Sequence, residues 1–315
     1  MKKILITGGT GFIGANFVHT FSARGEEVHV LKRKESSIDR IGDIKNRLFF
    51  HDVELSDTVR LEAILKEIKP DHILHFAAYG THQDVEQDIQ KTIETNLLGT
   101  INLLNTCAKI GFSSFINTGS TSEYGRKEHP MKETDVLEPN NLYGVTKAAG
   151  TLYCEQFGKK NDLPIVTMRL FSIFGYRESY NRLIPTLGRA VLLGEELKAI
   201  SPSTVRDFIF IEDVISAYLK AMDMIDTVKG NIFNIASGEE LSIADVVKTA
   251  EKVSGKRIKV SYGDFLAKQV EPEHWVGNIE KAREMLGWSP SHTFEEGFSK
   301  FLDWVKAAEK NRTTV

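Results

Sequence analysis

The sequence predicts an α/β protein with a doubly wound parallel sheet, followed by a smaller α+β lobe. Short β-branched runs alternate with amphipathic helical stretches through the first half of the 315-residue chain, as in successive βαβ units. A glycine-rich turn joins the first run to the first helix. After about residue 170 the alternation gives way to helices separated by short strands. We therefore expect two lobes, residues 1–170 and 171–315, with some later segments returning to the first.

In the first lobe the strands and helices are expected in strict alternation. The strands are expected at 3–7, 28–32, 48–53, 72–77, 114–118 and 165–170. The helices are expected at 13–23, 58–68, 85–110 and 143–160. Ser56 can cap the second helix, Gly25 and Gly111 can end two others, and Pro70 prevents one from continuing.

The second lobe is expected to contain helices at 183–193, 243–253, 279–286 and 294–307, with strands at 231–235 and 258–262. No repeat, low-complexity tract or flexible linker separates the lobes, so we expect them to share an interface and enclose a cleft. Open α/β sheets bind ligands at the carboxyl ends of their parallel strands, where that cleft would lie.

Composition narrows the class of protein. Hydrophobic residues make up 41% and charged residues 26% of the chain, as in ordinary globular proteins. The net charge of −3, with no basic cluster beyond residues 32–34, argues against a nucleic-acid partner. Cys107 and Cys154 lie in apolar helical patterns, which favours buried thiols over a disulfide or metal site. No apolar run is long enough to cross a bilayer and no signal segment precedes the first strand, so we expect a cytoplasmic protein without a membrane partner.

A glycine motif follows the first strand, where the chain reads Thr7-Gly8-Gly9-Thr10-Gly11-Phe12-Ile13-Gly14. Glycines at this place allow a tight turn and let the backbone approach a pyrophosphate, and the helix N-terminus supplies unpaired N–H groups. The sequence therefore predicts a dinucleotide-binding loop. Its contacts are expected from Gly8, Gly11, Phe12, Ile13 and Gly14.

The ends of the next two strands bear on which dinucleotide binds. NAD-specific enzymes usually place a carboxylate after the second strand, whereas Lys32 and Arg33 stand here. An arginine and a lysine suit a 2′-phosphate, which favours NADP, although a solvated basic strand end is the alternative. After the third strand, Asp52 and Val53 are placed to contact an adenine, or Asp52 caps the following turn.

A phenol and an ammonium are expected on one face of a helix in Tyr143-Gly144-Val145-Thr146-Lys147. A nearby lysine favours the phenolate, so Tyr143 can exchange a proton with a carbonyl or hydroxyl. Upstream, Ser120 lies at the end of the fifth strand, where its hydroxyl can hydrogen-bond the reacting oxygen.

Taken in order, these motifs resemble the extended short-chain dehydrogenases, also called the NAD-dependent epimerase and dehydratase family, over nearly the whole chain. The resemblance implies a Rossmann-type sheet and a catalytic set of Ser120, Tyr143 and Lys147, the last two also touching the cofactor. It implies further cofactor contacts from Phe76, Ala77, Ala78 and Asn96, and a structural role for His75.

The resemblance also implies that the second lobe binds a nucleoside-diphosphate sugar. Ser172 stands where the family usually has an asparagine. Arg206 is expected to bind the diphosphate, unless it pairs with Asp207 or another acid. The remaining substrate contacts are expected from Tyr79, Thr121, Ser122 and Arg182.

The reaction is chosen by the site, since this scaffold supports several. Family 4,6-dehydratases have an Asp-Glu pair directly after the catalytic hydroxyl, but Thr121 and Ser122 stand here and Glu123 comes one place later, which disfavours dehydration. We expect a reductase that uses NADPH on a 4-keto-6-deoxy sugar. The alternative is an epimerase with tightly bound NAD, and a non-catalytic dinucleotide sensor is a third interpretation. The helices at 85–110 and 143–160 resemble those that form a four-helix homodimer interface.

Overall fold

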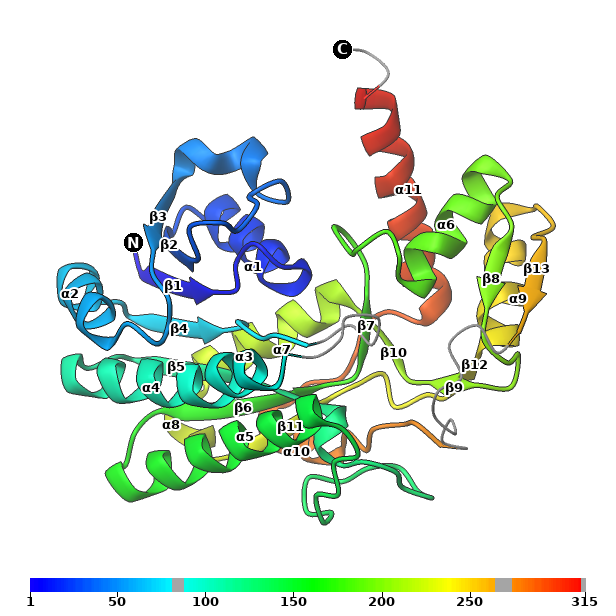
Figure 1. Ribbon diagram of the computed structural model, residues 1–315. Coiled ribbons are helices and arrows are strands. Elements are labelled where there is room, and N and C mark those ends of the chain that lie inside the picture. The colour runs from blue at the N-terminus through cyan, green and yellow to red at the C-terminus, as the bar shows by residue number, and fades with distance from the viewer. Residues whose placement is uncertain (81–87, 264–273, 313–315) are drawn as a thin grey trace.

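The computed structural model describes residues 1–80, 88–263 and 274–312. Seven parallel strands form its central sheet in the order β11-β6-β5-β4-β1-β2-β3 (Figure 1). This is the Rossmann strand order 3-2-1-4-5-6 with one strand added after β6. The strands are β1 Lys3–Thr7, β2 Glu27–Lys32, β3 Leu48–Asp52, β4 His72–His75, β5 Ser114–Ser120, β6 Ile165–Leu170 and β11 Ile232–Ile235.

Helices cover both faces of this sheet, because alternate residues of each buried strand point to opposite sides. On β1, Ile4 and Ile6 join a core cluster with α1 (Phe12–Ala23) and α7 (Ile211–Asp223). Leu5, between them, joins a second cluster on the other face. The helices of that second face are α2 Thr58–Ile68, α4 Gly99–Ile110 and α5 Leu142–Asn161.

The strand order reverses between β1 and β4, which lie side by side with Thr7 opposite His75. Chains leaving these two strands turn to opposite faces, which opens a crevice at their carboxyl ends. The crevice predicted from the sequence therefore lies beside the glycine motif that follows β1.

The second lobe lies to the right of the sheet in Figure 1. Its helices α6 (Leu183–Leu193) and α9 (Ile243–Ser254) accompany the parallel pair β8 (Leu197–Ala199) and β13 (Val260–Tyr262). The remaining elements are η1 Gly42–Arg47, α3 Ile89–Ile93, η2 Glu94–Leu98, η3 Thr121–Glu123, β7 Ser172–Phe174, β9 Val205–Arg206, β10 Phe208–Phe210, α8 Ile225–Val228, β12 Leu241–Ser242, α10 Glu280–Leu286 and α11 Phe294–Arg312.

Several predicted elements differ from the structure. Asp57, not Ser56, caps α2, because its carboxylate accepts the N–H of Arg60 at 3.0 Å. The helix predicted at 85–110 is interrupted in its described part by a π-turn, η2, between α3 and α4; residues 85–87 lie outside the described residues. The strand at 231–235 was assigned to the second lobe, but β11 pairs with β6 and extends the central sheet.

Helix α7 was absent from the prediction. Its buried Ile211, Val214, Ala217 and Tyr218 recur at helical spacing, so the pattern was present in the sequence. The preceding strand residues Phe208–Phe210 are apolar without a break, which hides the boundary between strand and helix.

Candidate active site

The glycine motif forms a tight turn that needs glycine at two positions. Gly8 has φ +67°, and a Cβ there would lie 2.6 Å from the backbone nitrogen of Ala77. A Cβ on Gly14 would lie 2.3 Å from the carbonyl oxygen of Gly8, so α1 can approach β1 only without a side chain. Gly11 is the N-cap of α1 and offers no side-chain cap. The first N–H groups of α1 are thus left for an anion, and the loop fits a dinucleotide pyrophosphate.

At the carboxyl ends of β2 and β3, Lys32 and Asp52 form an ion pair. They are partners in the β2–β3 register, and Lys32 Nζ lies 2.6 Å from Asp52 Oδ1. Arg60 Nε donates to the carbonyl of Asp52 at 2.7 Å. The Asp52 carboxylate is therefore paired with Lys32, and Lys32 is not a free cation. Arg33, one residue on, is exposed.

His75 lies at the end of β4, completely buried. The Thr100 hydroxyl donates to the carbonyl of Asn96 (2.7 Å), so it accepts from His75 Nε2 (2.9 Å), and Nδ1 then accepts from the Thr7 hydroxyl (2.7 Å). Burial, with the charge of Lys147 adding to it, lowers the pKa of His75 to about 3. A neutral imidazole fixed by two hydroxyls supports the structural role expected for it.

Asn96 fixes the chain that follows β4. It lies in the π-turn η2 and is 1% exposed. Its carboxamide oxygen accepts the N–H of Tyr79 (2.7 Å), and its Nδ2 donates to the carbonyl of Tyr79 (3.0 Å) and to the hydroxyl of Thr146 (3.0 Å). The segment with Phe76, Ala77 and Ala78 is thereby tied to α5. π-turns inside helices are frequent at functional sites.

The predicted catalytic side chains meet at the ends of β5 and α5. The Ser120 hydroxyl lies close enough to the phenol of Tyr143 to lower the pKa of that phenol. Asn141 caps α5 by accepting the N–H of Gly144 at 2.8 Å. A Cβ on Gly144 would lie 2.3 Å from the carbonyl oxygen of Ser122, so this glycine lets Tyr143 approach the Ser120 turn.

The electrostatics of this pair differ from the expectation. Burial raises the pKa of Tyr143 to about 12, while the Ser120 hydroxyl beside the phenol acts in the opposite direction. Burial also lowers the pKa of Lys147, which is 5% exposed. In the protein alone the phenol is thus protonated near neutral pH, and Lys147 does not by itself make it acidic.

A charged network lies directly beneath Ser120 and was not predicted as part of the site. Glu123 is fully buried, and its Oε2 accepts from Nε of Arg169 at 2.7 Å. Arg169 Nη1 also donates to the hydroxyl of Tyr124 at 2.9 Å. The signal available in the sequence was the capping-box spacing of Ser120 and Glu123, which the η3 turn adopts.

On the substrate side, Arg206 Nη1 donates to the carbonyl of Val205 at 2.7 Å, and its guanidinium lies 5.4 Å from the ring centroid of Trp275. Asp207 is fully buried and accepts the N–H groups of Ser237 (2.7 Å), Gly238 (3.1 Å) and Gly277 (3.0 Å). Burial raises its pKa to about 6, against these hydrogen bonds. Asp207 thus organises the backbone around Arg206. The predicted contact residues Thr121, Ser122, Ser172 and Arg182 are placed on η3, β7 and the start of α6.

The loop between β7 and α6 joins both lobes and was not predicted to matter. Arg177 has φ +65° and donates to Asn16 of α1, while the carbonyl of Tyr176 accepts from Asn16 Nδ2 at 2.7 Å. Arg40 Nε donates to the carbonyl of Arg177 at 2.8 Å, from the chain after β2. Nothing in the local sequence marks Arg40 for this role.

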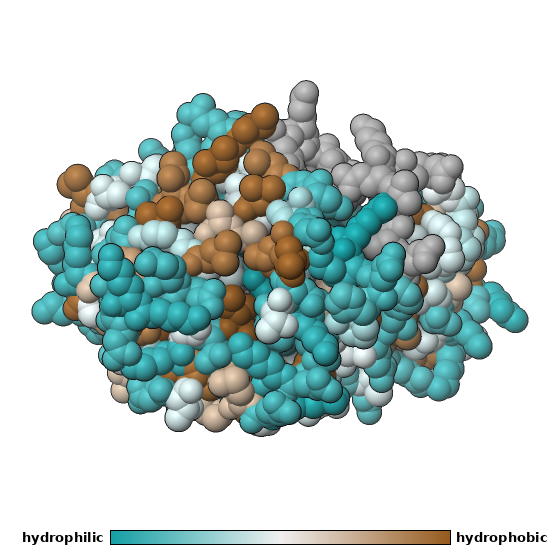
Figure 2. Space-filling model, turned by 90° about the horizontal axis from the view of Figure 1, so that it is seen from below, coloured by the Kyte–Doolittle hydropathy of each residue, from teal (hydrophilic) through white to brown (hydrophobic). Residues whose placement is uncertain are grey.

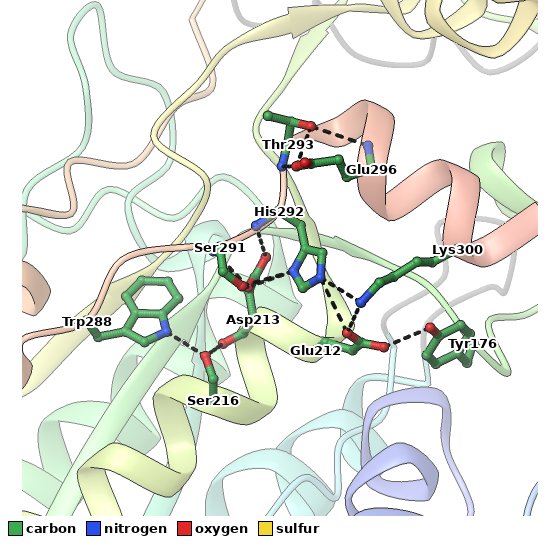
Figure 3. Close-up of polar contacts among 10 residues, drawn as sticks. All are labelled: Tyr176, Glu212, Asp213, Ser216, Trp288, Ser291, His292, Thr293, Glu296 and Lys300. Atoms are coloured by element: carbon green, nitrogen blue, oxygen red, sulfur yellow. Dashed lines mark hydrogen bonds and ion pairs between the residues drawn. The ribbon is translucent and has the colours of Figure 1, made fainter. Parts of the chain in front are cut away.

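Figure 3 shows the contacts that connect the loop between β7 and α6 to α7 and α11. The Tyr176 hydroxyl donates to Glu212 at 2.8 Å, and Glu212 pairs with Lys300 of α11 at 2.7 Å. His292 contacts both Lys300 and Asp213. The loop between β7 and α6 is therefore anchored to α7 and α11 as well as to α1.

One exposed apolar face lies on the helices predicted to form a dimer. Val145 and Leu152 are 47% and 51% exposed and stand seven residues apart on α5, hence on one side. Ile89 and Leu98 are 65% and 45% exposed on α3 and η2, which pack against α5. Figure 2, seen from the side of α5, shows apolar side chains gathered on this part of the surface. The homodimer stays a prediction.

No helix within the described residues is both long and apolar enough to cross a membrane. Within the same ranges, no group of three or more His, Cys, Asp or Glu side chains is arranged to hold a metal ion. Cys107 and Cys154 are buried and unbridged, as their sequence patterns indicated.

Known proteins with similar sequences and similar structures share this fold. A UDP-glucose 4-epimerase from Lactobacillus helveticus is 28% identical, over 98% of each chain. The structure of a Bacillus cereus UDP-glucuronic acid 4-epimerase with UDP-glucuronic acid and NAD is similar, with a TM-score of 0.85 and 27% identity over 97% of this chain and 99% of that one. A dTDP-glucose 4,6-dehydratase from Bacillus anthracis str. Ames, with NAD, gives a TM-score of 0.86 and 25% identity over 98% of both chains.

The fold and the glycine loop define an α/β enzyme of the Rossmann type. Residues 4–236 match the model of the NAD dependent epimerase/dehydratase family, and the chain belongs to this family. The more specific expectation, a reductase of 4-keto-6-deoxy sugars, is not supported, because the relatives just described are epimerases and a dehydratase.

Proposed function

We propose that the protein is a UDP-sugar 4-epimerase that keeps NAD bound through its catalytic cycle. The observation that carries the chemistry is the proximity of the Ser120 hydroxyl to the Tyr143 phenol, with buried Lys147 one helical turn further along α5. A hydroxyl and a phenol converging on one point suit proton exchange with a single sugar oxygen.

The choice of cofactor rests on the Lys32–Asp52 ion pair. A 2′-phosphate would have to compete with a carboxylate 2.6 Å from the lysine, so the strand end offers much less attraction to NADP than its sequence indicated. Two similar structures contain NAD. A bound, unexchanged cofactor suits an epimerase, because each turnover returns the hydride to the sugar.

The choice of sugar nucleotide rests on the relatives, which act on UDP-glucose or bind UDP-glucuronic acid. The relative with a dTDP substrate is a dehydratase, and Thr121 and Ser122 of this chain lack the carboxylates that water elimination uses. In this proposal Arg206 and Arg182 bind the diphosphate, and Tyr79, Thr121, Ser122 and Ser172 border the sugar.

The proposed reaction requires Tyr143 to be ionised once cofactor and sugar are bound. The phenolate then takes the proton of the sugar 4-hydroxyl and later returns it, while Ser120 holds that oxygen. A bound dinucleotide would supply the hydride acceptor and donor, and its oxidised form would add a positive charge to the site. Lys147 stabilises the phenolate by its own charge. Gly8, Gly11, Phe12, Ile13 and Gly14 hold the pyrophosphate, and Val53, Phe76, Ala77, Ala78 and Asn96 border the rest of the cofactor site.

A second candidate function is the reductase, which one observation favours: Arg33 is exposed at the end of β2 and can still meet a 2′-phosphate. The two functions differ in whether cofactor is consumed.

The test is to denature the purified protein, identify any released dinucleotide, and follow UDP-glucose and UDP-galactose by NMR without added cofactor. The proposal expects released NAD and interconversion of the two sugars. A protein that carries no dinucleotide and oxidises added NADPH in proportion to a 4-keto sugar would replace the epimerase with the reductase.

A further inference from the structure

Glu123 connects three parts of the catalytic centre, although the proposed mechanism gives it no role. Its Oε1 accepts the backbone N–H of Ser120 at 2.8 Å and the hydroxyl of Thr151 at 2.9 Å. Its Oε2 accepts from Arg169 at 2.7 Å. Ser120 ends β5, Thr151 lies on α5 and Arg169 on β6, so one carboxylate fixes the serine relative to the helix that carries the tyrosine and lysine.

Thr151 links this contact to the catalytic helix. It stands four residues after Lys147 and eight after Tyr143, on the buried side of α5. A change in the position of the Glu123 carboxylate would therefore alter the spacing between Ser120 and both side chains. Gly119 keeps the arrangement tight, because a Cβ there would lie 2.7 Å from Glu123 Oε1.

Arg169 is held in turn by a second layer. The Tyr124 ring lies 4.6 Å from its guanidinium, and the Tyr124 hydroxyl donates to Asn234 of β11 at 2.7 Å. The ion pair is buried on both sides, 2% and 0% exposed. Because a buried ion pair of this kind adds little net stability, we interpret the Glu123–Arg169 pair as fixing the position of the Glu123 carboxylate.

The charge of Glu123 acts on the groups around it. Burial lowers the pKa of Lys147, and Glu123 opposes that effect. Burial raises the pKa of Tyr143, and Glu123 raises it further. The titratable groups that face Glu123 are Tyr143, Lys147 and Cys154 of α5, Arg169 of β6 and Tyr124 after η3; Lys147 also faces His75 and Cys154.

We propose that Glu123 is a positioning residue of the catalytic centre, which fixes Ser120 against α5 and acts through its carboxylate on Lys147. The inference rests on the proposed roles of Ser120, Tyr143 and Lys147, but not on which sugar is converted. A residue that served only to cap the η3 turn would affect stability and leave the proton chemistry unchanged.

The test compares Glu123→Gln with the wild type and with Thr151→Val, which removes a hydrogen bond to the same carboxylate without changing any charge. Removal of the negative charge lowers the pKa of both Tyr143 and Lys147. In Glu123→Gln both limbs of the pH profile of kcat should therefore move to lower pH, with KM little changed. Thr151→Val should lose stability while its limbs stay where the wild-type limbs lie. A folded Glu123→Gln whose profile superimposes on the wild type would overturn the proposal.

Glu123→Gln leaves Arg169 without its counter-ion and can fail to fold. The double variant Glu123→Gln, Arg169→Met removes both charges, and it should show the same shift, since Arg169 is not among the charges that act on Tyr143.

A failure of the proposed epimerase function can be told apart from a failure of the Glu123 inference, because the first appears as an absence of epimerisation in the wild type itself. In that case the tyrosinate absorbance of Tyr143 is titrated against Tyr143→Phe as the blank. The Tyr143 signal should appear at lower pH in the Glu123 variant than in the wild type, and an equal or higher pH contradicts the inference.

Discussion

Lys32 Nζ lies 2.6 Å from Asp52 Oδ1, so the basic end of β2 is neutralised by the neighbouring strand. Replacement of Asp52 by Asn should free the lysine and raise the affinity for NADPH. Because hydrogen bonds to charged groups contribute about 1.5–3 kcal/mol, and Asp52 is partly exposed to solvent, we expect a gain of roughly tenfold or less. Fluorescence titration with NADPH and NADH measures it. Asp39→Asn, which removes an exposed acid from the segment between β2 and η1, should change neither affinity. An Asp52→Asn protein with unaltered NADPH binding would contradict the argument.

Tyr143→Phe should lower turnover by at least the ~10²-fold typical of a lost general acid, with the cofactor still bound. Ser120→Ala should be slowed less, because water can replace part of its hydrogen bond. Steady-state turnover and the amount of dinucleotide released on denaturation check both. If Tyr143→Phe turned over at a near-normal rate, Tyr143 would have no part in proton transfer.

The sequence predicted the fold well where local pattern and tertiary structure agree. The bounds of β1, β6, α2 and α6 were predicted correctly, because a local signal marks one end of each: the glycine motif after β1, Pro164 before β6, Pro70 after α2 and Gly194 after α6. The glycine turn and the spacing of Tyr143 and Lys147 are equally local. Both can be found without knowing what packs against them.

What the sequence did not reveal depends on partners distant in the chain. The Lys32–Asp52 pair needs the β2–β3 register, and Glu123 with Arg169 needs β5 beside β6. Lys32 was therefore interpreted as a phosphate ligand, which led to NADP and a reductase. Lys32 and Arg33 were identified correctly as basic residues at the strand end, but the pairing of Lys32 with Asp52 was not predicted.

Leu152→Glu should give a monomer if α5 forms part of a dimer interface. The side chain is 51% exposed in one chain, so the change should leave the fold intact, while a charge buried between two apolar faces would be strongly unfavourable. Light scattering after size-exclusion chromatography measures the mass. Leu193→Glu is the matched control, because Leu193 is 55% exposed at the end of α6 in the second lobe. A wild-type protein that is already monomeric would refute the predicted interface.

Glu178 lies in the loop between β7 and α6, with its side chain 6% exposed and its Oε1 3.9 Å from Arg182 Nε. Its Oε2 is buried and has no hydrogen-bond partner among the described residues. Burial raises its pKa from 4.5 to about 8, although the Arg182 charge and the N–H of Gly175 oppose this. The carboxyl is therefore protonated in the folded protein at neutral pH and ionised in the unfolded chain.

The sign of the effect on stability follows from linkage. The folded pKa lies above the unfolded one, so the contribution of Glu178 is complete below pH 4.5 and is lost as the pH rises to about 8. At about 1.36 kcal/mol per pH unit, the loss is on the order of 5 kcal/mol. Glu178→Gln carries no such charge, so its free energy of unfolding relative to the wild type should increase with pH over this range. Urea denaturation at a series of pH values measures it, with the exposed Glu284→Gln as the control. A constant difference between Glu178→Gln and wild type from acid to alkaline pH would mean that Glu178 is ionised in the folded protein.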